Sequence, residues 1–250
     1  MQVNFSNLMK KRIYLILLSV IVIFFSCKDD SGQFEKQLFT NEQINIALKD
    51  CLQLTSDTTL NTLCIVDTVN KKLGYSYYES EAYRIDFPAA AKPLIDTLTA
   101  YGFGDAMDTL IININYAAEK CGNKIKSEFL QPLIKKITFQ NPYQILHGEN
   151  SAITNYVKKN NQTEFIALLK NSILLEQFNT LKIISTWNTL QEEYYNITGK
   201  YSAIDILDSS TQQMVDGFFK LMGVWEEAVR NDPKLRGKET EWFYRVFATL

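Results

Sequence analysis

The sequence contains very few of the residues that most catalytic and metal sites require, and few that break helices. Its 250 residues include one histidine, four cysteines, five prolines and ten glycines. A Ser-His-Asp or Cys-His set would have to use the single histidine, His147, and the usual zinc patterns need more histidines or paired cysteines. There is also no glycine-rich phosphate loop, so we predict no metal and no cofactor. The scarcity of proline and glycine favours long helices over the many turns of an all-β protein.

Basic clusters are absent as well. The formal net charge is −2, and residues 1–26 contain three basic residues and no acid, so the remainder is more acidic than the whole. An acidic chain without a basic patch is a poor binder of nucleic acid, and we predict no nucleic-acid partner. A hydrophobic content of 46% and an aromatic content of 12% indicate a folded chain rather than a disordered one.

The first thirty residues have the organisation of an export signal. Three basic residues at positions 10–12 precede an apolar run over residues 13–25, which is too short for a transmembrane helix of about 20 residues. The run ends in Ser26-Cys27, and a small residue directly before a cysteine at this point resembles the bacterial lipobox. The resemblance implies that Cys27 is acylated and that the chain is cut before it. The alternative is an uncut signal anchor in which Cys27 is incidental.

The residues after the cysteine indicate where the anchored protein resides. Lys28-Asp29-Asp30 resembles the lipoprotein export signal of one group of Gram-negative bacteria, in which a lysine and two acids direct the protein to the outer face of the outer membrane. The resemblance implies an outer-membrane lipoprotein that faces the cell surface, with the periplasmic face as the alternative. We therefore divide the chain into a signal peptide (1–26), a lipidated cysteine with a polar tether (27–37) and an all-helical domain (38–250).

The rest of the chain shows the spacing of amphipathic helices and no convincing alternation of strands. Apolar residues recur every three or four positions, most clearly in a stripe that begins after Gly104 and extends to Phe129. We expect Pro132 to kink or restart this helix. Other expected helix starts are Thr40, Asp57, Asn161, and Ser209 or Ser210. The pattern predicts an all-α protein, a single-domain bundle of about eight helices.

Three cysteines remain once Cys27 is assigned to lipid, which is an odd number for an oxidising compartment. At most one disulfide can therefore form within the chain. Cys51 and Cys64 are the nearest pair, and both fall on apolar helix faces. They form either that disulfide or two buried free thiols.

Polar residues on the apolar faces are the candidates for a site. Asn113 and Asn115 lie in the helix after Gly104, and Glu119 borders its alanine-rich face. The two asparagines either form hydrogen bonds between helices or line a polar pocket together with Glu119. Carboxylate catalysis would need two acids at one cleft, and the candidates are Glu119, Glu192, Glu193, Asp216, Glu226 and Glu227.

Two other features have expected structural roles. Glu226 and Arg230 are four residues apart, and we expect them to pair on the surface of a helix. His147 precedes Gly148 at an expected helix C-terminus, where a protonated imidazole is stabilised by the helix dipole. Catalysis by His147 is the alternative.

Three stretches of the chain together resemble one bacterial family. They are residues 115–119, Asn-Tyr-Ala-Ala-Glu; residues 137–156, with Ile-Thr-Phe, Ile-Leu-His-Gly and Ala-Ile-Thr-Asn-Tyr; and residues 217–247, with Gly-Phe-Phe, Glu-Glu-Ala-Val-Arg-Asn-Asp-Pro and Val-Phe. Their order and spacing resemble domain of unknown function 4197 over residues 39–247. The resemblance implies an all-helical exported protein without a settled activity, and it transfers no catalytic residues. Members usually have a small or polar residue where this chain has His147, so no shared role of His147 is implied.

These observations predict a membrane-anchored lipoprotein that is a non-catalytic binding or scaffolding module of the cell envelope. Its expected partners are the membrane, through the N-terminal lipid, and a protein of the envelope. One alternative is a carrier of an apolar or lipid ligand between helices, with Asn113, Asn115 and Glu119 near the pocket. Another is a carboxylate-based hydrolase. The alternatives require, respectively, a sizeable internal cavity and two carboxylates roughly 5–9.5 Å apart at one cleft.

Overall fold

The computed structural model describes residues 38–64, 74–75 and 83–250. The expected signal peptide, Cys27, the Lys28-Asp29-Asp30 sequence and the expected tether up to residue 37 lie outside the described residues. Asn41–Leu250 forms one compact unit, and its described part contains helices and no strand. The prediction of a single all-α domain is confirmed. None of the described helices combines the length and the apolar character needed to cross a membrane.

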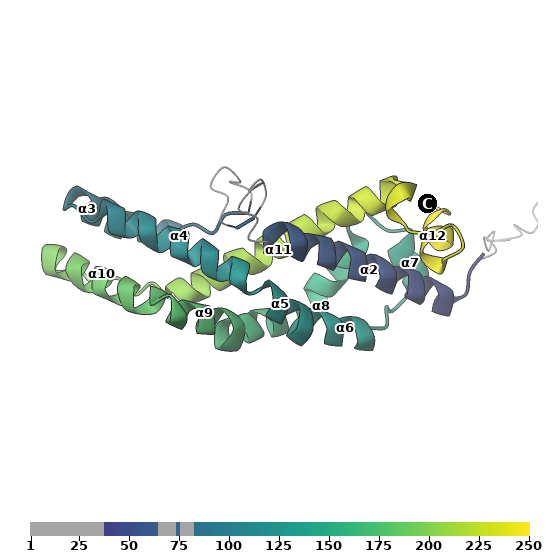
Figure 1. Ribbon diagram of the computed structural model, residues 1–250, viewed down its shortest axis with the longest axis horizontal. Helices are drawn as coiled ribbons and strands as arrows, with labels where there is room; N and C mark the ends of the chain where they lie inside the picture. The colour runs from purple at the N-terminus through teal and green to yellow at the C-terminus, as the bar shows by residue number, and fades with distance from the viewer. Residues whose placement is uncertain (1–37, 65–73, 76–82) are drawn as a thin grey trace, which may run out of the picture. The chain divides into compact units, whose positions relative to one another are not determined.

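Figure 1 labels the helices in chain order. Their bounds are α2 Asn41–Leu63, α3 Lys92–Ala100, α4 Gly104–Lys120, α5 Gly122–Lys124, α6 Gln131–Lys136, α7 Pro142–Leu146, α8 Ala152–Leu168, α9 Leu174–Thr180, α10 Ile183–Thr198, α11 Ile206–Asn231 and α12 Trp242–Phe247. Two π-helical segments join neighbouring α-helices, Ile125–Leu130 between α5 and α6 and Leu169–Ile173 between α8 and α9.

Helix α2 is continuous, and the expectation of a new helix at Asp57 is wrong. No glycine or proline interrupts the helix, and its threonine hydroxyls donate to carbonyls one turn earlier at 2.7–2.9 Å: Thr55, Thr58, Thr59 and Thr62. These side chains are thus satisfied inside the helix instead of ending it. Asp57 accepts a hydrogen bond from Gln53 Nε2 at 2.6 Å and pairs with Lys126 Nζ at 2.8 Å, so it caps nothing.

The long helix expected after Gly104 is divided. Helices α4 and α5 and a π-helical segment follow one another, and α6 begins with Pro132 in its first turn, which confirms the expected restart. The division lies where this helix approaches the end of α2. A Cβ atom added to Gly122 would lie only 2.6 Å from Cβ of Cys64. The lack of a side chain at Gly122 permits this close approach of the two backbones.

Two other expected helix starts are also wrong. Asn161 lies inside α8 and is half-buried. Its polar side chain is partly exposed to solvent on the helix surface and does not cap a helix start. Helix α11 begins at Ile206, three or four residues before Ser209 and Ser210. The carboxylate of Asp205 caps it by accepting the backbone N–H of the third helical residue at 2.9 Å.

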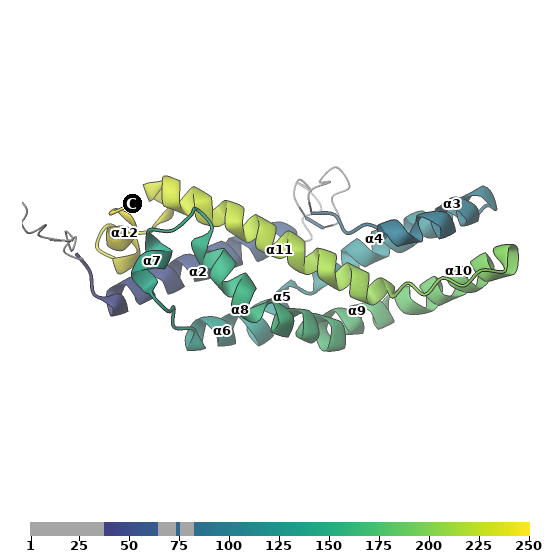
Figure 2. The ribbon, with the colours of Figure 1, turned by 180° about the vertical axis from the view of Figure 1, so that it is seen from behind.

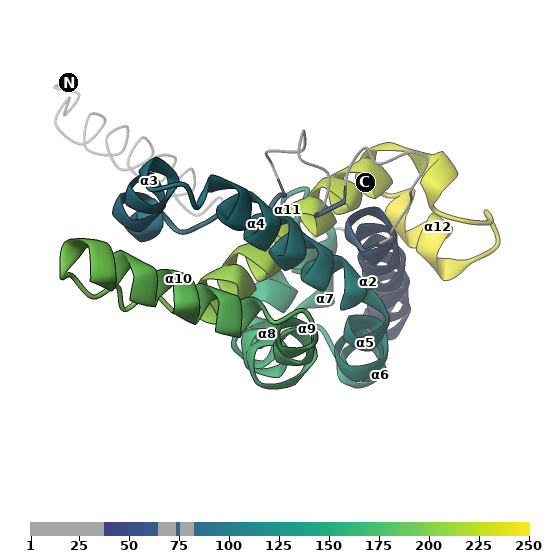
Figure 3. The same cartoon turned by 60° about the vertical axis from the view of Figure 1, so that its left-hand side comes forward.

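Helix α11 is the central element of the helical unit. Helices α2 and α8 pack along it and α12 packs on α2, while α10 contacts α3, α4 and α9 (Figures 1 and 2). Figure 3 shows α3, α4 and α10 on one side of α11, with α2 and α12 on the other. Much of the interior is aromatic: the ring of Phe165 stacks on Phe129 at 4.2 Å and meets Phe218 and Phe219 edge-on.

Candidate functional site

Asn115, one of the three predicted pocket residues, is a structural hydrogen-bonding residue. Its side chain is buried and binds both backbone groups of Ile85, accepting from N–H at 2.8 Å and donating to C=O at 2.8 Å. It also donates to the carbonyl of Ile111 in its own helix at 2.9 Å. Asn115 thus holds the non-helical segment before α3 against α4. Of the two roles predicted for it, hydrogen bonding is correct, but the partner is a non-helical segment rather than a helix.

The other two predicted residues do not converge with Asn115 on one pocket. Asn113 is half-buried, and two residues along a helix place its side chain on a different face from Asn115. Glu119 is four residues after Asn115 and shares its face, with an exposed fraction of 6%. Glu119 lines the polar cavity described next, and Asn113 and Asn115 are not among the residues of its wall.

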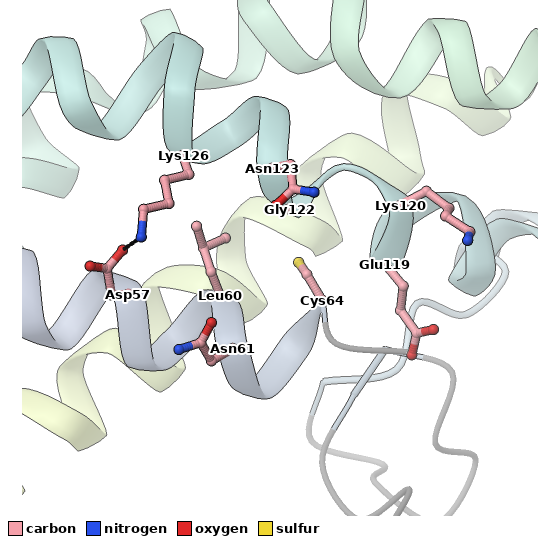
Figure 4. A pocket seen from close by; sticks show the side chains of 9 residues that line it. All are labelled: Asp57, Leu60, Asn61, Cys64, Glu119, Lys120, Gly122, Asn123 and Lys126. Carbon is pink, nitrogen blue, oxygen red and sulfur yellow. Dashed lines mark ion pairs between the residues drawn. The ribbon is translucent and has the colours of Figure 1, made fainter. Parts of the chain in front are cut away.

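This polar cavity has a volume of about 240 Å³ and lies where the C-terminal half of α2 meets the junction of α4 and α5. Figure 4 shows its wall: Asp57 and Asn61 come from α2, and Cys64 follows this helix directly. Glu119 comes from the end of α4, and Asn123 and Lys126 come from α5 and the π-helical segment after it. Apart from Glu119, sequence reasoning did not assign these residues to a pocket. They are separated by about sixty residues along the chain, and no local pattern connects them.

The cavity carries charges of both signs. At one end, Lys126 Nζ lies 2.8 Å from the carboxylate of Asp57 (Figure 4). At the other end, Glu119 is packed so closely that a Cβ atom on Gly74 would lie 2.7 Å from its Oε1. The neighbouring Lys120 holds its ammonium group 4.8 Å from the ring centre of Tyr116.

The cysteines of the helical unit are free thiols. Cys51 lies in α2 and Cys64 directly follows it, thirteen residues or about 20 Å further along, whereas a disulfide needs Cα atoms within about 7 Å. The disulfide alternative is therefore wrong, although Cys64 is half-buried rather than fully buried. Burial raises the pKa of the Cys64 thiol, and burial also raises the pKa of Cys121 to about 12. Neither thiol is ionised appreciably at neutral pH, so neither is activated as a nucleophile.

Glu226 and Arg230 pair as expected, but they are buried and not on the surface, with exposed fractions of 1% and 4% for their side chains. Glu226 accepts the backbone N–H groups of Ile153 and Thr154, at 3.0 and 2.8 Å, and the hydroxyl of Thr154 at 2.8 Å. It thereby caps the N-terminus of α8 from another helix. Burial raises the pKa of Glu226, while Arg230 and these donors oppose the shift.

Two arginine side chains extend this arrangement to the ends of three further helices, α7, α11 and α12. Arg230 donates to Glu226 at 2.8 Å and to the carbonyls of Leu146 and Ile145 at the end of α7. Arg236, 5% exposed, donates to Val229 and Phe247 carbonyls at 2.8 Å, which joins the ends of α11 and α12. Sequence reasoning missed Arg236; the only signal was a basic residue just after the end of a long helix. Glu226, Arg230 and Arg236 form what we call the buried ionic cluster.

Two of the remaining candidates, Asp216 and Glu227, line an open cavity of about 320 Å³ between α8 and α11. They are eleven residues apart in α11, or about 16 Å, which is more than the roughly 5–9.5 Å of a catalytic carboxylate pair. The other candidates are dispersed over the surface. His147 is exposed and follows the last residue of α7, as expected, with its ring 4.4 Å from that of Tyr143. Asp216 pairs with Lys158 at 3.1 Å, and Glu227 accepts a hydrogen bond from an asparagine at 3.0 Å. Glu192 and Glu193 lie on α10. Within the described residues, no group of three or more histidine, cysteine or acidic side chains could hold a metal ion.

The family model described as "Protein of unknown function (DUF4197)" matches residues 38–248. The chain belongs to this family. The DUF4197 match confirms the resemblance seen in the sequence, and it extends over helices α2 to α12. Both the polar cavity and the buried ionic cluster are therefore parts of the DUF4197 domain. No curated protein and no solved structure matches the chain.

Proposed function

We propose that this DUF4197 protein is a lipoprotein, anchored through Cys27, whose helical unit is a non-catalytic binding module of the bacterial cell envelope. The observation that carries the anchor is Ser26-Cys27 at the end of a basic and then apolar N-terminal segment. Several acyl chains hold a protein stably on a membrane, whereas one chain binds only marginally. The Lys28-Asp29-Asp30 sequence supports placement on the outer face of the outer membrane.

The hydrogen bonds of the buried carboxylate Glu226 support a binding role rather than catalysis. The most deeply buried acid, Glu226, has its oxygens occupied by Arg230, two backbone N–H groups and a hydroxyl. Such a carboxylate stabilises the packing of helices and is not open to a substrate. In the wall of the polar cavity, by contrast, the buried side chains of Leu60 and Glu119 border an open space, and we expect binding there.

The residues that line the polar cavity argue against the two alternative functions. An apolar or lipid ligand would need an apolar wall, but six of the nine residues that line this cavity have charged or amide side chains. A carboxylate hydrolase could use Asp57 and Glu119, but Asp57 already accepts from Gln53 and is paired with Lys126. An activity abolished by Glu119→Gln would contradict the non-catalytic proposal.

Metabolic labelling with a palmitate analogue tests the anchor. We expect the full-length protein to incorporate the label and to lose its first 26 residues, and Cys27→Ser to abolish both changes. The label is the decisive measurement, because an uncut Cys27→Ser chain retains its apolar N-terminal segment and can stay with the membrane. Cys64→Ser is the matched control and should label normally. Labelling of Cys27→Ser at the wild-type level would overturn the anchor.

Native mass spectrometry of the lipidated protein, gently extracted from its own membranes, tests the binding role. We expect an additional mass, either a small molecule or a second protein, that is lost on denaturation. A bare lipidated monomer would count against a binding module. Proteinase added to intact cells tests the location, because a protein on the cell surface is digested and one on the periplasmic face is protected.

A further inference from the structure

Two of the free thiols come together where the end of α2 meets the junction of α4 and α5. Cys64 directly follows α2, and Cys121 lies between α4 and α5. The sulfur of Cys64 lies 3.9 Å from the carbonyl oxygen of Ala118, and the backbone N–H of Cys121 donates to the same oxygen at 3.1 Å. Both cysteines therefore contact one carbonyl group, although they are far apart in the sequence.

The backbones at the two cysteines are close enough for a disulfide to form after a small shift. Figure 4 shows Cys64 beside Gly122, which directly follows Cys121. A Cβ atom added to Gly122 would lie 3.9 Å from Cα of Cys64. Since consecutive Cα atoms are about 3.8 Å apart, the Cα atoms of Cys64 and Cys121 are at most about 9 Å apart. A disulfide needs them within about 7 Å, so the bond requires an approach of about 2 Å at most.

Both cysteines lie where the backbone can make this approach. Cys64 is the first residue after α2, and Cys121 lies between two helices rather than inside one. A shift at a helix end breaks fewer backbone hydrogen bonds than a shift inside a helix. The sulfur of Cys121 contacts the carbonyl oxygen of Ala117 at 3.2 Å, so a change of rotamer is also required to turn it toward Cys64. Cys51 has no such freedom, because it is fully buried inside α2.

The two thiols differ in their access to an oxidant. Cys64 lines the polar cavity, whereas Cys121 has an exposed fraction of 0%. Burial raises the pKa of both thiols, and the nearby Cys121 raises the pKa of Cys64 further. Because the thiolate is the form that reacts, oxidation of the folded protein is slow at neutral pH. We therefore expect the bond to form while the chain folds, or when the junction of the helices opens.

We propose that Cys64 and Cys121 are a disulfide-forming pair, and that a disulfide oxidant joins the end of α2 to the α4–α5 junction through them. The Cys64 thiolate attacks one sulfur of the oxidant and releases the other as a thiolate. The Cys121 thiolate then attacks the Cys64 sulfur of this mixed disulfide and releases the second thiolate. Two protein thiols become one disulfide, and their two protons and two electrons pass to the oxidant, whose disulfide becomes two thiols. Since export places the chain in an oxidising compartment, this inference rests on the proposed function.

Oxidation of the purified full-length protein in detergent tests the pair independently of export. The protein is reduced, equilibrated with oxidised glutathione at mildly alkaline pH, unfolded in N-ethylmaleimide and digested for mass spectrometry. We expect two peptides joined through Cys64 and Cys121, with Cys51 modified by maleimide. Maleimide on all three residues, or glutathione retained on Cys64 beside a free Cys121, would overturn the inference.

Thermal unfolding of variants shows whether the bond fits the fold. The bond closes a loop of about 57 residues, so oxidation should raise the midpoint of thermal unfolding by at least about 4 °C. Cys51→Ser is the matched control and should show the same rise, whereas Cys64→Ser and Cys121→Ser should show none. An unchanged or lower midpoint of the oxidised protein would show that the bond strains the fold, and would overturn the inference.

Thiol trapping in cells tests the bond in its own compartment. Intact cells are quenched with acid and treated with N-ethylmaleimide, which preserves the state of each thiol. We expect Cys64 and Cys121 to be joined in protein that carries the palmitate label at Cys27. Free thiols at both positions in labelled protein would overturn the inference and leave the anchor standing. A chain that lacks the label but forms the bond with glutathione would overturn the anchor and support the pair.

Discussion

Two buried carboxylates of this protein, Glu226 and Glu119, have different surroundings. Glu226 in α11 accepts hydrogen bonds from the start of α8 and from Arg230, inside a tightly packed core. Glu119 at the end of α4 is nearly as buried but borders a cavity of about 240 Å³. Both residues carry an acid into the interior, and Glu119 lies in the wall of an open space whereas Glu226 is enclosed by the ends of α7 and α8.

The difference separates a structural carboxylate from a candidate binding carboxylate. A buried acid is stable when every oxygen is hydrogen-bonded, and removing one partner then leaves an unpaired charge in the core. The buried ionic cluster meets this condition and connects the ends of α7, α8, α11 and α12. The polar cavity instead places charged side chains of both signs, among them Asp57, Glu119 and Lys126, beside an open space.

The largest effect on stability is expected from Glu226→Met. This change leaves Arg230 without its anionic partner and frees the N–H groups at the start of α8. The free energy of unfolding should fall by about 3–5 kcal/mol, measured by chemical denaturation followed by circular dichroism. The control is the neighbouring exposed acid, where Glu227→Met should cost no more than about 0.5 kcal/mol. Similar losses for both variants would show that burial of the cluster does not stabilise the fold.

A smaller loss is expected from Asn115→Leu, which removes three hydrogen bonds and leaves both backbone groups of Ile85 unpaired. The free energy of unfolding should fall by about 1–3 kcal/mol. Hydrogen exchange of the Ile85 amide should become faster than that of amides within α11. Asn113→Leu on another face of α4 is the control and should leave this exchange rate unchanged. Equal exchange rates in the two variants would show that Asn115 does not hold the segment.

The smallest effect on stability is expected from Glu119→Gln. The amide preserves the shape of the side chain beside Gly74, and the cavity can admit water, so the loss should stay below about 1 kcal/mol. Denaturation measured as for Glu226→Met gives a direct comparison. A loss of the same size as for Glu226→Met would make Glu119 a structural carboxylate and remove the contrast between the two regions.

Local features of the sequence predicted part of this arrangement. Helical spacing identified the all-α class, and the proline at position 132 marked the start of α6. The helix starts expected at Asp57 and Asn161 were wrong because an isolated polar residue looks the same in sequence on an exposed helix face and at a cap. Spacing of four predicted the pairing of Glu226 with Arg230, but the surface location was wrong.

The sequence by itself determined the helical class, the family and the expected N-terminal signal, because each depends on residue types at short and regular spacing. Only the tertiary structure decided which acids are buried and what surrounds them. Glu226 meets Thr154 across 72 positions, and Asp57 shares a cavity with Glu119 through the crossing of α2 with the α4–α5 junction. Such contacts arise from the packing of distant helices, and no local pattern encodes the volume left between them.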